Sequence, residues 1–182
     1  MPRVPDLDPA VMTEHQRKVY DMIASGPRGR VRGPLAVWLN RPGLAEHAQA
    51  LGQYCRYDSS LPPRLSELAI LVLARHWNSE FEWWAHKAIA LKAGLPADVI
   101  DAIRDRQPPP FASESEAVVV EFVTVLHAQR GIPDDLYARA VALLGQDSVI
   151  DLVGIAGYYT LISMTINVFD VQPPEGEPRE MA

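Results

Sequence analysis

The stretch from Ser66 to Gly94 constrains the fold of this chain most, because its apolar residues recur with helical spacing. The pattern predicts two helices separated by a break near Trp77 and Asn78. The apolar positions of the first helix are Leu68, Ile70, Leu71, Leu73 and Ala74, and those of the second are Phe81, Trp84, Ala85, Ala88 and Leu91. We therefore expect a central antiparallel helix pair.

Polar residues interrupt the apolar stripes of both predicted helices. Glu67 shares an i, i+3, i+4, i+7 stripe with three aliphatic residues, so a carboxylate lies where an apolar side chain is expected. On the second helix, Ser79, Glu82 and His86 are related by i, i+3 and i+7. Facing helices could bring all four side chains into one polar cluster in apolar surroundings, which would suit acid–base chemistry.

Each of these residues also has a purely structural interpretation. Ser79-x-x-Glu82 before an apolar run is a capping-box pattern, so both residues could simply start a helix. Glu67 could be a surface carboxylate, and His86 could be a hydrogen-bonded core histidine. Glu82 and His86 at i, i+4 could bind a metal with a third ligand such as His76 or Glu67, but two ligands on one helix are weak support, and we expect no metal and no cofactor.

The rest of the chain also predicts helices and shows no alternating strand pattern, so the expected fold class is all-α. Capping and proline signals predict further helix starts near Thr13, Pro34, Pro42, Pro96, Ser113 and Pro133. The segment 148–169 is the most apolar and approaches the length of a membrane span. Asp151, Asn167 and the lack of flanking Lys or Arg favour a buried or interface helix instead, and we expect no membrane partner.

Composition narrows the class of protein further. The 182 residues suit a single domain, with a proline-rich, charged tail at 172–182 that we expect to be flexible. A formal charge of −6 and the lack of a basic run argue against nucleic acid as a partner. Cys55 is the only cysteine, and the N-terminus has no apolar signal segment, so we expect a reducing cytoplasm.

The same residues resemble the carboxymuconolactone decarboxylase and alkylhydroperoxidase D superfamily. Its core helix pair carries a glutamate followed by a Cys-x-x-Cys-x-x-x-His run. Glu67 matches the glutamate, Ser79 and Glu82 take the two cysteine positions, and His86 matches the histidine. The resemblance spans roughly residues 33–169. It includes two further segments, K-A-G-L-P-A-D-V-I-D-A-I from Lys92 to Ile103 and G-Y-Y-T-L-I-S-M-T-I-N from Gly157 to Asn167.

The decarboxylase branch of this superfamily implies a cofactor-free lyase that acts on a small carboxylate or lactone. In that case, His86 is the expected proton donor or base, and Glu67 is its orienting carboxylate. Ser79, at the start of its helix, could hold an anion or oxyanion, and Glu82 could be a second acid or base. Arg75 could neutralise a substrate carboxylate, and three aromatic residues could form a pocket wall: Trp83, Trp84 and Tyr158.

Other functions stay open at this point. The alkylhydroperoxidase branch implies peroxide reduction, but a dithiol cycle needs two thiols and this chain has only Cys55, which we interpret as a buried spectator. A non-catalytic oligomeric module is the third possibility, since fold does not determine reaction. The resemblance also implies self-association as a trimer or hexamer.

Overall fold

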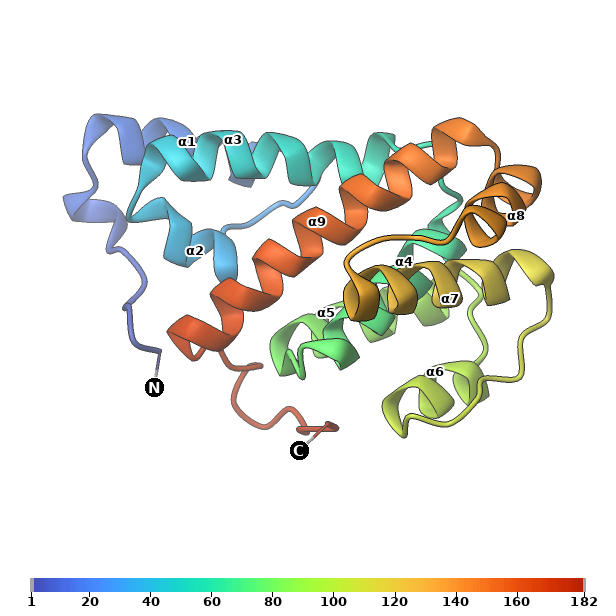
Figure 1. The fold of residues 1–182 in the computed structure, drawn as a ribbon. Coiled ribbons are helices and arrows are strands. Elements are labelled where there is room, and N and C mark those ends of the chain that lie inside the picture. The colour runs from blue at the N-terminus through green and yellow to red at the C-terminus, as the bar shows by residue number, and fades with distance from the viewer. Residues whose placement is uncertain (1, 182) are drawn as a thin grey trace.

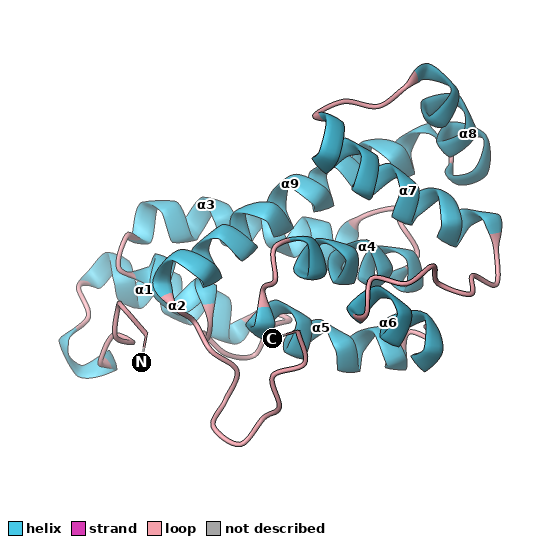
Figure 2. Cartoon of the chain, turned by 60° about the horizontal axis from the view of Figure 1, so that its bottom comes forward, coloured by secondary structure: helices cyan, strands magenta, loops and turns pink. Residues whose placement is uncertain are grey.

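The chain folds into helices joined by short connections (Figure 1). The computed structural model describes residues 2–181, and within them no strand is present (Figure 2). The all-α expectation is confirmed. The helices are α1 (Glu14–Ser25), α2 (Pro34–Leu39), α3 (Pro42–Gln53), α4 (Pro63–His76), α5 (Glu80–Lys92), α6 (Ala97–Arg104), α7 (Glu114–Gln129), α8 (Asp134–Leu144) and α9 (Gln146–Phe169).

Local sequence signals determine where several helices begin. Thr13 and Gln16 form a reciprocal capping box at the start of α1, in which the Thr13 hydroxyl accepts from the Gln16 N–H. Pro34, Pro42 and Pro63 are the first residues of α2, α3 and α4, where a missing N–H costs nothing. A π-helical turn at 54–58 continues directly from the end of α3.

The antiparallel pair α4–α5 and the long helix α9 form the centre of the molecule. Asn78 adopts a left-handed conformation with φ of 48°, which lets the chain reverse directly between α4 and α5. Figure 1 shows α9 crossing the molecule, and it contacts α2, α3, α4, α5 and α8. Buried apolar side chains from all of these helices form one connected core. A polar group that faces this core is therefore destabilising unless it finds a partner inside the protein.

Helix α9 is long and apolar enough to cross a membrane by length and composition, as its sequence already suggests. It is the one helix among the described residues that meets this criterion, and 61% of its most apolar window is buried inside the molecule. Such burial is typical of a core helix, which can pass the same test.

The C-terminal segment differs from the flexible tail that its composition suggests. It packs on α5, where the backbone N–H of Glu180 donates to the carboxylate of Glu80 at 3.1 Å. The Glu180 carboxylate in turn accepts from the Lys87 ammonium at 2.6 Å. Composition cannot predict these contacts, because Glu180 is distant in sequence from its partners Glu80 and Lys87. Ala182, the last residue of the predicted flexible tail, lies outside the described residues.

Candidate active site

Three ionisable side chains meet between α4 and α5. Glu67 lies on α4, and Glu82 and His86 lie one turn apart on α5. His86 Nδ1 is 2.7 Å from a Glu67 oxygen, and His86 Nε2 is 3.0 Å from a Glu82 oxygen. Each of the three residues is only 4% exposed. The structure thus brings together three of the four residues that the sequence places in one polar cluster, hereafter the Glu67–His86–Glu82 triad.

The two carboxylates determine the charge of the imidazole between them. Burial alone would lower the pKa of His86, because a charged ring is poorly solvated in the core. The negative charges and hydrogen bonds of Glu67 and Glu82 outweigh burial and raise the pKa of His86 to about 9. His86 is therefore an imidazolium at neutral pH and donates one N–H to each carboxylate.

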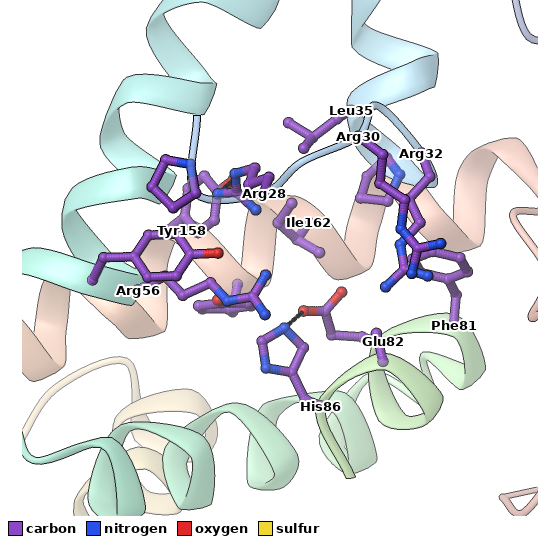
Figure 3. A pocket seen from close by; sticks show the side chains of 15 residues that line it. Arg28, Arg30, Arg32, Leu35, Arg56, Phe81, Glu82, His86, Tyr158 and Ile162 are labelled. Carbon is purple, nitrogen blue, oxygen red and sulfur yellow. Dashed lines mark hydrogen bonds and ion pairs between the residues drawn. The ribbon is translucent and has the colours of Figure 1, made fainter. Parts of the chain in front are cut away.

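A cavity of about 170 Å³ opens beside Glu82 and His86, whereas Glu67 does not line it. Figure 3 shows the Glu82 carboxylate between the His86 ring and the open part of the cavity. Tyr158 and Tyr159 contribute to the wall, and the Tyr159 ring meets the His86 ring edge-on at 5.1 Å between centroids. The triad is consequently layered, with Glu82 and His86 in the cavity wall and Glu67 behind it.

Four arginines also line this cavity, and sequence reasoning missed them. They are Arg28, Arg30, Arg32 and Arg56. Three come from the loop between α1 and α2, and the fourth comes from the π-helical turn after α3. The alternating Arg-x-Arg-x-Arg spacing in a chain of net negative charge was the available signal. These side chains make the cavity strongly positive around the triad.

Ser79 takes neither of the two roles that the sequence suggests. It precedes α5 as its N-cap, but its side chain makes no capping hydrogen bond. The hydroxyl is buried without a hydrogen-bond partner, and Ser79 does not line the triad cavity. Glu82 cannot complete a capping box because its carboxylate is directed to His86. The capping-box interpretation is wrong, and the structure does not place the Ser79 hydroxyl at the site.

Arg75 and Trp83 lie away from the triad cavity, whereas Tyr158 lines it as expected. Arg75 donates to the Asn78 side chain at 2.7 Å and lines a separate cavity. Trp83 is buried and donates through Nε1 to Glu180. Helical geometry explains the position of Trp83: as the residue after Glu82 on α5, its side chain points about 100° away from that of Glu82, toward the C-terminal segment.

The triad does not have the arrangement of a metal site. Within residues 2–181, no group of three or more His, Cys, Asp or Glu side chains could hold a metal ion. In the triad, both nitrogens of His86 already face carboxylate oxygens. The third ligand considered from sequence, His76, lies against His127 instead, with 5.2 Å between the centroids of the two tilted rings.

Gly52 on α3 provides the space that the Tyr158 ring occupies. A Cβ at this position would lie 2.1 Å from the Tyr158 hydroxyl oxygen. We expect Gly52→Ala to displace Tyr158 and to lower the free energy of unfolding by about 1–3 kcal/mol, the usual cost of overpacking. Gly43→Ala is the matched control, because a Cβ at this position of α3 meets nothing within 4 Å. Urea unfolding that finds both variants equally stable would contradict this explanation.

The fold and the triad define a class: an all-helical protein with a buried carboxylate–histidine cluster on a central helix pair. Residues 42–124, which include the whole triad, match the Carboxymuconolactone decarboxylase family. This match covers less than half of the chain and supports the resemblance to the carboxymuconolactone decarboxylase and alkylhydroperoxidase D superfamily, in a sequence without the Cys-x-x-Cys motif. None of the curated proteins matches the sequence.

Two solved structures share the fold over nearly the whole chain. One is an uncharacterized peroxidase-related protein from Silicibacter sp. TM1040, with a TM-score of 0.77, 13% identity, and coverage of 96% of this chain and 92% of that one. The other is described as an alkylhydroperoxidase AhpD core, an uncharacterized peroxidase-related protein from Ralstonia eutropha JMP134. Its TM-score is 0.78 with 14% identity, and the match covers 96% of this chain and 93% of that one. At such low identity these similarities show the fold alone.

Proposed function

We propose that this protein is a cofactor-free acid–base enzyme, a lyase or decarboxylase that acts on a small carboxylate or lactone. The observation that carries the proposal is the Glu82–His86 pair at the wall of a cavity lined by four arginines. A carboxylate hydrogen-bonded to an imidazolium can exchange a proton with a ligand, and the arginines can hold an anion beside it. The match to the decarboxylase family supports the same reaction class.

In the proposed reaction, the bond between a substrate carbon and its carboxylate breaks, and carbon dioxide leaves. The electron pair of that bond passes into an enolate, which takes up a proton at carbon. The proton leaves His86 Nε2 and reaches the substrate through Glu82, because both His86 nitrogens are engaged and Glu82 lies nearer to the cavity. This relay replaces the direct donation from His86 that the sequence suggests. Glu67 orients the ring, and water later restores the proton.

The proposal is tested with a panel of small acids that release carbon dioxide. We would assay acetoacetate, oxaloacetate and a carboxylated butyrolactone with wild type, His86→Ala and, as the control, His47→Ala, whose side chain is exposed. The expected result is turnover by wild type and His47→Ala that His86→Ala loses while thermal melts show it to be folded. Full activity in a folded His86→Ala protein, or no turnover of any member of the panel, would count against the proposal and favour a non-catalytic module.

Thiol-dependent peroxidase activity is the alternative that the two structural relatives suggest. Cys55 is 1% exposed, and burial, followed by the nearby charge of Asp151, raises its pKa to about 11. A protonated, buried thiol is a poor nucleophile, and Ser79 and Glu82 occupy the positions of a Cys-x-x-Cys pair. We therefore expect no peroxide turnover with a dithiol reductant. Catalysed turnover would contradict this, and Cys55→Ala would show whether Cys55 causes it. A single buried thiol also suits the cytoplasm, where we place the protein.

Self-association is also part of our proposal. Helix α9 exposes a stripe of apolar side chains at helical spacing: Ile150, Val153, Met164 and Val168, which are 62%, 48%, 40% and 54% exposed. Large exposed apolar patches on soluble proteins often mark interfaces. We expect light scattering at micromolar concentration to give the mass of a trimer or hexamer, and Val153→Glu to reduce that mass. A monomer mass for wild type would contradict this prediction.

A further inference from the structure

A second cavity, of about 350 Å³, lies between α4, the end of α6 and α7, and we call it the α4–α7 cavity. Helix α6 lies below α7 in Figure 1, and both helices pack on α4. Pro108 and Pro109, in the connection from α6 to α7, also line the cavity, and their fixed φ angles make this part of the wall stiff. Among the described residues, none lines both this cavity and the triad cavity.

The lining of the α4–α7 cavity combines apolar side chains with a few positive or neutral polar ones. Besides the two prolines, the apolar residues are Val72, Ile103, Val120 and Val123. The polar residues are Arg75, His76, Arg106, Gln107 and Thr124. None of the described lining residues is Asp or Glu. Ligand pockets typically have this composition, with many apolar groups and a small number of polar ones that orient the ligand.

Two arginines of the lining converge without a carboxylate between them. Arg75 and Arg106 both donate to the side-chain oxygen of Asn78, at 2.7 Å and 3.2 Å, and Arg75 also donates to the backbone oxygen of Met181 at 3.4 Å. Within residues 2–181, neither arginine forms an ion pair, and Arg75 Nε is buried without a hydrogen-bond partner. A neutral amide oxygen compensates neither positive charge, so an anion would be a better shared acceptor.

The nearby carboxylates are already engaged with other groups. Both oxygens of Asp105 accept from Arg104, at 2.8 Å and 3.0 Å. Both oxygens of Glu80 accept from backbone N–H groups of the C-terminal segment, at 3.1 Å and 2.8 Å. Burial and then the charge of Arg106 lower the pKa of Arg75, and the negative charges of Asp105 and Glu80 offset this only in part. The positive charge at the cavity therefore remains uncompensated.

We propose that the α4–α7 cavity binds a small apolar monocarboxylate. Its carboxylate lies between Arg75 and Arg106, whose guanidinium groups suit carboxylate oxygens, and its hydrocarbon part packs against the apolar lining residues. Burial, followed by the charges of His127 and Arg106, lowers the pKa of His76, so its ring is neutral at pH 7 and adds an N–H donor rather than a third charge. One carboxylate consequently satisfies the charged end of this cavity.

This site is separate from the proposed active site and does not depend on the proposed function. The sequence suggests that Arg75 could neutralise a substrate carboxylate, but Arg75 lines the α4–α7 cavity and not the triad cavity. An anion held by Arg75 would therefore occupy a second site on the other cavity. Loss of binding here should leave the chemistry of the triad unchanged.

Methyl NMR of the full chain tests the proposal, because Ile103 lines the α4–α7 cavity and Ile162 lines the triad cavity. The probes are hexanoate, acetate, which lacks the hydrocarbon chain, and hexanol, which lacks the charge, all at equal ionic strength. Hexanoate should shift the Ile103 methyl signal with a Kd about tenfold or more below those of acetate and hexanol. Binding seen at Ile162 alone would place the carboxylate in the triad cavity and overturn the proposal.

Arg106→Gly should weaken hexanoate binding by about tenfold, the loss expected for one charge-assisted hydrogen bond near the surface. Arg106 follows α6 with a φ of 56°, which glycine adopts without steric cost, so the free energy of unfolding should not fall. Arg130→Gly is the matched control, because Arg130 has a φ of 61°, is exposed and lies outside the cavity lining. An unmoved Ile103 signal, hexanol that binds as tightly as hexanoate, or equal hexanoate binding by the two variants would each overturn the proposal.

Discussion

Glu82→Gln should lower kcat for the active member of the acid panel by about 10²- to 10⁴-fold, the usual contribution of a positioned acid or base. Glutamine keeps the shape of the side chain and can still accept a hydrogen bond from His86 Nε2, but it cannot carry a proton. The fold should therefore survive while the relay from His86 to the cavity is lost. KM should change much less than kcat, because the arginines hold the substrate.

Steady-state kinetics with Glu175→Gln as the control would check this expectation. Glu175 is an exposed residue of the C-terminal segment, so the control removes the same charge outside the cavity lining. An unchanged kcat in a folded Glu82→Gln protein would show that Glu82 does not transfer the proton. A rise in KM with kcat unchanged would assign Glu82 to binding instead.

Glu67→Ala should strongly lower the free energy of unfolding. It leaves the buried His86 imidazolium with Glu82 as its one remaining carboxylate partner, and removing one member of a buried charge pair typically costs about 3–5 kcal/mol. Urea unfolding at neutral pH measures this loss. Glu46→Ala is the matched control, because Glu46 also pairs with a histidine, His15, but in a largely exposed position.

The pH dependence of this loss has a definite sign. The pKa of His86 is raised from 6.5 to about 9 in the folded protein. The contribution of the protonated ring to stability is therefore fully present below pH 6.5 and is lost as the pH rises through about 9. The stability difference between wild type and Glu67→Ala should consequently shrink as the pH rises through that value. A difference that is constant across the range, or no larger than that of Glu46→Ala, would argue against a buried imidazolium.

The helices and the triad were predictable because they depend on spacing within single helices. Glu82 and His86 at i, i+4 necessarily share a face of α5, and Glu67 interrupts an apolar stripe of α4 that has to face the core. Once both stripes are known, a short connection between the helices brings the polar groups together. The sequence therefore contained most of the triad before any packing was known.

The positions of the cavity arginines and of the Ser79 side chain could not be predicted from the spacing of residues along single helices. Arg28 and Arg32 reach the cavity because the loop before α2 crosses toward α5, where Gly33 has a φ of 60° and a Cβ would lie 2.4 Å from the Phe81 ring. The capping box failed at Ser79 because His86 competes successfully for the Glu82 carboxylate. Both outcomes depend on contacts between elements, which periodicity within one helix cannot predict.

Solvent deuterium labelling tests most directly whether the Glu82–His86 pair delivers a proton to a substrate carbon. The acid panel is incubated with the enzyme in D₂O, and the products are analysed by NMR against blanks without protein. Wild type should form a product that carries one deuterium at the carbon that lost carbon dioxide, faster than the blank, and folded Glu82→Gln and His86→Ala should form it no faster than the blank. Labelling at the wild-type rate by either folded variant would contradict the proposed relay.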